Sequence, residues 1–79
     1  MAITYHVDTF IDAKGMMCPM PVLTLAKTIR TMQAGQIVAM AATDYGAIKD
    51  VPAWSNKTGN ELLETVEENG ITTFYIKKA

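Results

Sequence analysis

The sequence predicts a two-layer α/β sandwich with the element order βαβαββ, in which two helices cover one face of a mixed four-stranded sheet. Strand-like stretches alternate with two stretches of helical apolar spacing, and an Asn-Gly pair joins the last two strand-like stretches. The chain has 79 residues, no internal repeat and no linker, which leaves room for one core. We therefore expect a single domain over residues 1–79.

The first strand is expected over residues 5–11, where β-forming residues alternate with period two. A helix follows directly after Cys18, because Pro19 and Pro21 suit a first helical turn, whose N–H groups have no partner within the helix. Gly35 is expected to end this helix. Its apolar stripe consists of Val22, Leu25, Ala26, Ile29 and Met32.

Residues 36–43 contain a continuous apolar run, which predicts a central strand that is buried on both faces. Helical crossovers before and after this strand make the first three strands parallel. Right-handed crossovers are compatible with both helices lying on the same face of the sheet.

The second helix is expected over residues 45–58, with Asp44 or Asp50 as its N-cap and Gly59 just beyond its last turn. Pro52 leaves two alternatives open, a kinked helix or a shorter helix that is capped by Asp50. The apolar face of this helix would carry Ile48, Val51 and Trp54.

Asn69 and Gly70 both tolerate positive φ, so they predict a type I′ turn between strands over residues 62–68 and 71–78. This hairpin adds the fourth strand in the antiparallel direction. Counting outward from the turn pairs Glu67 with Thr72, Thr65 with Phe74 and Leu63 with Ile76, which places Leu63, Phe74 and Ile76 on the core face.

Charge and cysteine content narrow the classes of function. The net charge of −1 offers no electrostatic footprint for a polyanion, so we expect no direct nucleic-acid partner. A single cysteine cannot form an internal disulfide, which favours a reducing compartment. The N-terminus lacks the basic start and apolar run of a signal peptide, and no stretch approaches a membrane span. We expect a soluble cytoplasmic protein with no membrane partner.

Cys18 is the candidate reactive residue. It falls where the loop after the first strand meets the first helix, so unpaired N–H groups and the positive end of the helix dipole would face its sulfur. Lys14 could add a positive charge, and we expect the thiolate to be favoured. The alternative is a buried, unreactive cysteine that packs as a small hydrophobe.

Residues 12–21, Asp-Ala-Lys-Gly-Met-Met-Cys-Pro-Met-Pro, resemble the signature of the TusA/SirA-like sulfurtransferase family. An acidic residue, a glycine and the Cys-Pro-x-Pro helix start stand at the family's spacings, and residues 42–44 and 49–54 also look like the family. The similarity covers nearly the whole chain. The fold that it implies, similar to the C-terminal domain of translation initiation factor three, has the same βαβαββ order.

The resemblance implies a sulfurtransferase that acts as a sulfur carrier and holds sulfane sulfur as a persulfide on Cys18. A cysteine desulfurase or rhodanese-like donor would supply the sulfur, and an acceptor protein in a sulfur relay would take it by thiol exchange. Neither a cofactor nor a metal is implied. A second thiol could attack the persulfide, so a lone cysteine suits a carrier. Relatives serve tRNA thiolation, cofactor synthesis and sulfur oxidation, and some are linked to selenium.

Five further residues match the motif as supporting residues. Asp12 would shape the loop through backbone N–H bonds or take part in proton handling. Lys14 is either a solvated surface residue or an electrostatic aid to the thiolate. Gly15 would supply an unusual backbone angle, and Pro19 and Pro21 start the helix.

Met16, Met17 and Met20 flank Cys18. Flexible apolar side chains suit a surface that accepts several partners, and they also suit an irregular core. We expect a shared docking patch for the donor and the acceptor, with core packing as the alternative.

Two other classes of function stay open. One is a non-catalytic protein-interaction or regulatory module, which needs no persulfide. The other is Cu(I) binding by the thiolate and neighbouring thioethers. The ligand set for copper is thin, because Cys-x-x-Cys is absent and His6 alone on a strand is more typical of a half-exposed sheet residue. We expect the free protein to be a monomer.

Overall fold

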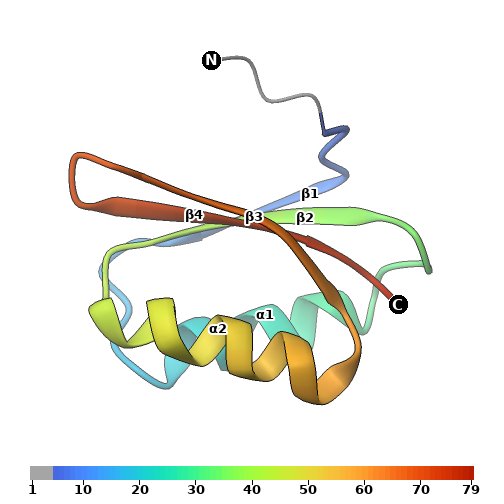
Figure 1. Ribbon diagram of the computed structural model, residues 1–79, viewed down its shortest axis with the longest axis horizontal. Coiled ribbons are helices and arrows are strands. Elements are labelled where there is room, and N and C mark those ends of the chain that lie inside the picture. The colour runs from blue at the N-terminus through green and yellow to red at the C-terminus, as the bar shows by residue number, and fades with distance from the viewer. Residues whose placement is uncertain (1–4) are drawn as a thin grey trace.

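The computed structural model describes residues 5–79 and has the order βαβαββ, so the predicted fold class is confirmed. Figure 1 shows the sheet in one layer and both helices together in the second. Residues 1–4, which belong to the N-terminus on which the absence of a signal peptide was predicted, lie outside the described residues. The elements are β1 (Thr9–Ala13), α1 (Met20–Ile29), β2 (Ile37–Ala42), α2 (Tyr45–Thr58), β3 (Glu61–Glu68) and β4 (Ile71–Lys77).

The strands lie in the order β1-β2-β4-β3. β1 pairs with β2 in parallel, and β4 runs antiparallel to both β2 and β3, so the first three strands point the same way, as predicted. β2 is a central strand that is buried on both faces. Val38 and Met40 belong to the core beneath the helices, whereas Ala39 and Ala41 alternate with them on the opposite face.

The core fills the space between the two layers. Each helix is amphipathic and turns one stripe of apolar side chains onto the sheet, where burial removes them from water. No helix within residues 5–79 is long and apolar enough to cross a membrane. The largest fully buried side chains are Phe74, Leu25, Met40, Ile76, Val38, Val51 and Pro21.

The first strand is shorter and later than predicted. β1 begins at Thr9 because its ladder partner β2 has only six residues, and Thr9 already pairs with Val38 near the start of β2. His6 precedes the strand, is exposed, and lies 3.2 Å from the Asp8 carboxylate through its Nε2 atom. The interpretation of His6 as a strand residue was therefore wrong.

The first helix ends at Ile29 and not at Gly35. The N–H groups of Thr31 and Met32 bond to carbonyls three residues back, which tightens the chain and lets it turn toward β2. Gly35 has a φ of +90° within this connection, and its N–H donates to the carbonyl of Lys78. Met32 remains buried beyond the end of the helix.

The second helix spans Tyr45–Thr58 without interruption, so the shorter alternative that begins at Asp50 is wrong. Asp44 is the cap, and its side chain accepts a hydrogen bond from the N–H of Gly46. Gly59 ends the helix in the left-handed conformation, as predicted. Val51 is buried and Trp54 packs against the core, as predicted, but Ile48 is exposed, and Ala47 and Ser55 are the other buried residues of the helix.

The hairpin turns at Asn69 and Gly70, which have φ values of +54° and +80°, as a type I′ turn requires. Near the turn the predicted pairs are present, Glu67 with Thr72 and Thr65 with Phe74. Farther out the prediction was wrong, because a register shift between Leu62 and Glu64 adds an extra residue to β3. Leu62, not Leu63, therefore opposes Ile76 and packs against the core.

Candidate functional site

Two loops meet at the carboxyl end of the parallel pair β1–β2. Ala13 and Ala42 are neighbours at the ends of these strands, so the loops that lead into α1 and α2 leave the sheet side by side. The N–H of Gly15 donates to the hydroxyl of Thr43 at 3.0 Å, and the N–H of Cys18 donates to Asp44 Oδ2 at 3.2 Å. The two helix starts are thus joined at one end of the molecule (Figure 1).

Cys18 lies in the first of these loops and is exposed. Pro19 occupies the N-cap position of α1, and Met20 is the first helical residue. The sulfur is therefore accessible at the beginning of a helix, as predicted, and the alternative of a buried cysteine is wrong.

The start of α2 packs closely beneath this loop. Asp44 Oδ2 accepts hydrogen bonds from the N–H groups of both Cys18 and Gly46. A Cβ atom at Gly46 would lie 2.8 Å from that oxygen, which is closer than Cβ atoms pack, and 3.2 Å from the Cβ of Cys18, which is a tight contact. A larger residue at position 46 would require the Asp44 side chain and the Cys18 loop to shift, so glycine favours the close approach of the two helix starts.

The thiol of Cys18 donates a hydrogen bond to Asp50 on α2, with 2.8 Å between Sγ and Oδ2. This hydrogen bond, partial dehydration of the sulfur, and the negative charges of Asp50 and Asp44 raise the pKa of the Cys18 thiol. The expected stabilisation of the thiolate is therefore wrong. The helix start and Lys14 alone would favour the thiolate, but folding also brings the carboxylates of Asp50 and Asp44 near the sulfur.

The loop before Cys18 is shaped by its own polar groups. Asp12 Oδ1 accepts a hydrogen bond from the backbone N–H of Lys14 at 3.1 Å, which is the loop-forming contact expected of it. Gly15 has a φ of +85°, a backbone angle that L side chains rarely adopt. Pro21 is fully buried in the first turn of α1.

Comparison with known proteins decides the family. The sequence model described as sulfurtransferase TusA matches residues 9–78. The chain belongs to the TusA family. It is 46% identical over 72 residues to the sulfur carrier protein TusA of Allochromatium vinosum, a match that covers 91% of this chain and 95% of that protein. It is 44% identical to the putative sulfur carrier protein YrkI of Bacillus subtilis, over 90% of this chain and 95% of the relative.

A solved structure supports the fold of this TusA-family chain. The crystal structure of a SirA-like protein from Desulfitobacterium hafniense superposes with a TM-score of 0.77 and covers 87% of this chain and 95% of its own. Its sequence identity is 24%, so this likeness concerns the fold alone.

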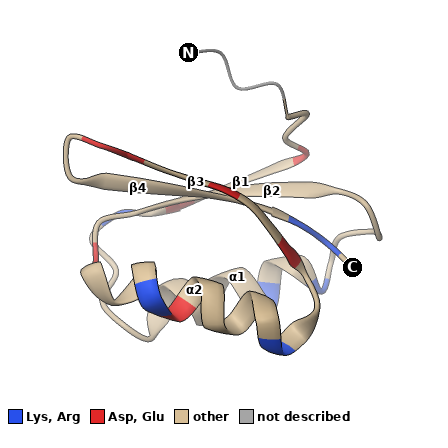
Figure 2. Ribbon diagram, viewed as in Figure 1, with Lys and Arg blue, Asp and Glu red and all other residues tan. Residues whose placement is uncertain are grey.

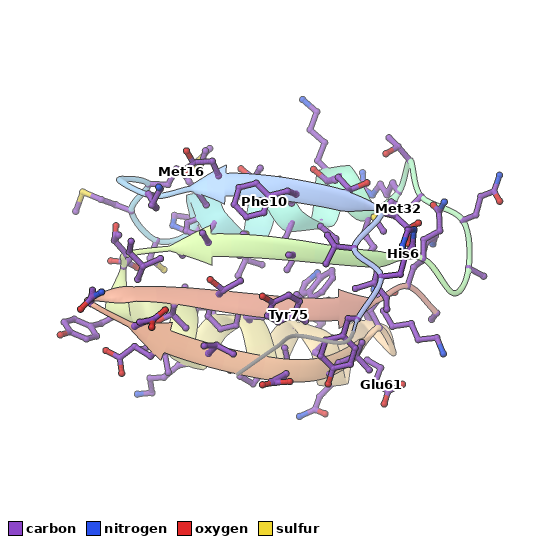
Figure 3. All side chains as sticks on the ribbon, turned by 90° about the horizontal axis from the view of Figure 1, so that it is seen from above. His6, Phe10, Met16, Met32, Glu61 and Tyr75 are labelled. Carbon is purple, nitrogen blue, oxygen red and sulfur yellow. The ribbon has the colours of Figure 1, made fainter. Side chains whose placement is uncertain are left out.

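The structure separates the three methionines that flank Cys18 of this TusA-family protein. Met16 is half-buried against the core, at the end of β1 in Figure 3, and its Sδ accepts a hydrogen bond from Thr24 at 3.7 Å. Met17 is 74% exposed, and Met20 is also exposed. The alternative of core packing therefore describes Met16, and the surface interpretation describes the other two.

Three exposed apolar residues near the helix starts were not predicted. Leu23 lies in the first turns of α1, and Tyr45 and Ile48 lie in the first turns of α2. Tyr45, the first residue of α2, is 80% exposed. A large apolar residue directly after the Asp44 cap was the available signal, but only a core-facing stripe was predicted for this helix.

Proposed function

We propose that this TusA-family protein is a cytoplasmic sulfur carrier, which accepts sulfane sulfur as a persulfide on Cys18 and passes it to an acceptor protein. The observation that carries the proposal is the position of Cys18, the only cysteine in the chain, exposed at the start of α1. Relatives that are named sulfur carrier proteins support it across nearly the full chain.

The chemistry needs only the sulfur and access to it. In loading, the thiolate of Cys18 attacks the terminal sulfur of a donor persulfide, and in unloading an acceptor thiolate attacks the terminal sulfur on Cys18. A second thiol on the same chain could instead attack the persulfide and close a disulfide. A chain with one cysteine avoids that loss.

The partners that fit this chemistry are proteins with a reactive cysteine. A cysteine desulfurase or a rhodanese-like protein would be the donor, and a protein thiol would be the acceptor. Met17 and Met20, with Leu23, Tyr45 and Ile48, present exposed apolar side chains from the Cys18 loop and the starts of α1 and α2. We call these five residues the apolar collar, and we propose that both partners contact it when they approach Cys18.

The test is transfer of one sulfur atom. The purified protein is incubated with a cysteine desulfurase and L-cysteine, and its intact mass is measured without reductant. We expect a gain of one sulfur atom in the parent chain and no gain in Cys18→Ser, with unchanged thermal unfolding, because the replaced side chain is exposed and similar in size. Sulfur gained by the serine variant, or none gained by the parent, contradicts the proposal.

A further inference from the structure

The hydrogen bond between Cys18 and Asp50 joins residues from the two helix starts that are 32 positions apart in the sequence. Asp50 is half-buried on α2, and its Oδ2 atom lies 2.8 Å from the sulfur. Neither the turn chemistry of the Cys18 loop nor the capping of α2 requires this contact, because Asp44 provides the cap. The contact places the Asp50 carboxylate within hydrogen-bond distance of the sulfur atom that would carry the persulfide.

The charged groups around this sulfur are predominantly negative. From the side of α2, Asp50 and Asp44 both act on it. The first turn of α1 contains no charged residue. Asp12 lies in β1, Lys14 lies in the loop between β1 and Cys18, and Lys49 is adjacent to Asp50 in the sequence. Opposite the positive end of α1, the sulfur thus faces two carboxylates, which disfavour a negative charge on it.

We propose that Asp50 controls the reactivity of Cys18: its carboxylate holds the resting sulfur as a protonated thiol, and a donor that presents a positive charge beside its own sulfur releases the thiolate. This inference rests on the proposed function, because it concerns the same sulfur. A Lys or Arg side chain of the donor would pair with Asp50 and Asp44 and neutralise the electrostatic effect of these carboxylates on the sulfur. The preferred partner is therefore a persulfide or disulfide that is flanked by a cation.

The transfer balances without an oxidant or a cofactor. The thiol of Cys18 gives its proton to water, and the thiolate attacks the terminal sulfur of the donor persulfide. An S–S bond forms at Cys18 Sγ while the S–S bond of the donor breaks. The donor sulfur leaves as a thiolate and takes up a proton, so a thiol and a persulfide yield a persulfide and a thiol. Asp50 returns to its original state.

Three small disulfides of similar size and different charge test the proposal without any partner protein, and division by the rate with a peptide corrects for their different leaving thiols. Cystamine is positive, bis(2-hydroxyethyl) disulfide is neutral, and 3,3′-dithiodipropionate is negative. The rate at which each forms a mixed disulfide with Cys18 is measured by intact mass and divided by its rate with an unstructured cysteine peptide. We expect cystamine to be favoured over dithiodipropionate by about fivefold or more, the effect of one charge pair at contact in water. Salt at about 1 M should largely remove this preference.

Variants of Asp50 test whether this residue causes the preference for the positive disulfide. In Asp50→Asn the ratio between the positive and negative disulfides should fall severalfold, and the neutral disulfide should react faster at neutral pH, because the thiolate forms at lower pH. Asp50→Ser, which also lacks the charge, should behave in the same way. Glu61→Gln removes one negative charge from an exposed position at the start of β3, at the opposite end of the sheet from the Cys18 loop, and should keep the parental ratio. Thermal unfolding confirms that each variant is folded.

The two proposals can fail independently. An unchanged charge preference and an unchanged pH profile in both Asp50 variants would overturn the role of Asp50, and so would the absence of any preference in the parent chain. Either result leaves sulfur loading from a desulfurase intact. Failure of that loading in the parent would reject the sulfur carrier itself.

Discussion

At the scale of single residues, acidic side chains determine the state of Cys18. The sulfur lies at the start of a helix, as predicted from the sequence, where a partial positive charge favours a thiolate. Asp50 and Asp44 act in the opposite direction and lie against the sulfur only in the folded chain. Their combined effect is to raise the pKa of the Cys18 thiol, which favours the protonated form in the free protein.

The first prediction concerns alkylation of Cys18. Because the pKa of the thiol is raised, the thiol persists to higher pH, and the rate of reaction with iodoacetamide should rise at higher pH than for an unstructured cysteine peptide. Mass spectrometry over a pH series measures both profiles. A profile for the protein that lies at lower pH than that of the peptide would show that the helix start dominates over the carboxylates.

The second prediction concerns Gly46. Helix propensity alone predicts that Gly46→Ala stabilises α2 by about 1 kcal/mol. The new Cβ would instead meet Asp44 Oδ2 at 2.8 Å and the Cβ of Cys18 at 3.2 Å, so the loop must shift, and we expect a loss of about 1–3 kcal/mol. Denaturant unfolding measures the sign. Asn56→Ala, on the exposed side of the same helix, is the control, and stabilisation by Gly46→Ala would contradict the close packing.

At the scale of elements, the starts of α1 and α2 act together. The parallel pair β1–β2 brings their loops to one end of the sheet, and the residues of the apolar collar belong to the same loop and helix starts as the acidic residues Asp44 and Asp50. Acidic side chains also mark β3, where Figure 2 shows red segments along the strand, and this strand lies at the far edge of the sheet. Glu61, at the start of that strand, pairs with Lys77 in the row of Ile37, at the opposite end of β2 from Ala42, so it serves as a charge control away from Cys18.

The third prediction separates docking from packing among the methionines. Met17→Asp and Met20→Asp should weaken binding to a sulfur donor, because a charge would be desolvated at the contact, while thermal unfolding stays close to that of the parent. Met16→Asp should instead lower the stability by about 1–3 kcal/mol, since Met16 packs against the core. Donor affinity and melting temperature are measured for all three. Normal donor binding by both exposed variants would contradict the docking role.

At the scale of the whole molecule, one core connects both layers. The radius of gyration is 11.3 Å, close to the roughly 11.6 Å expected of a compact domain of this length. Figure 3 shows the face of the sheet that the helices leave uncovered, with Phe10 of β1 and Tyr75 of β4 on it. Tyr75 is partly covered by Tyr5, whose ring centroid lies 5.6 Å away.

The fourth prediction tests whether this core unfolds as one unit. Phe74→Leu, at a fully buried position of β4, should lower the free energy of unfolding by about 1–2 kcal/mol. Circular dichroism and the fluorescence of Trp54, the only tryptophan, should report the same transition, because Trp54 packs against the core from α2. Separate transitions would show that the helical layer and the sheet unfold independently.

The sequence by itself determined those features that arise from local pattern. Period and turn chemistry predicted the βαβαββ order, the Asn69-Gly70 turn and the helix that starts at Cys18-Pro19, because each depends on residues close together in the chain. Counting residues outward from the turn predicted the wrong register in the hairpin, where the pairing of β3 with β4 departs from strict alternation. The predicted pairing of Leu63 with Ile76 was wrong because the alternation of apolar and polar residues does not reveal the bulge in β3.

Only the tertiary structure decided the chemistry around Cys18. Asp44 and Asp50 could be interpreted from sequence as helix caps, but their distances to the sulfur depend on how two helix starts pack at the end of a parallel strand pair. The same packing turned Tyr45 and Ile48 outward and Met16 inward. Electrostatic effects depend on separation in space, so residues 32 positions apart reversed the expected direction of the pKa shift at Cys18.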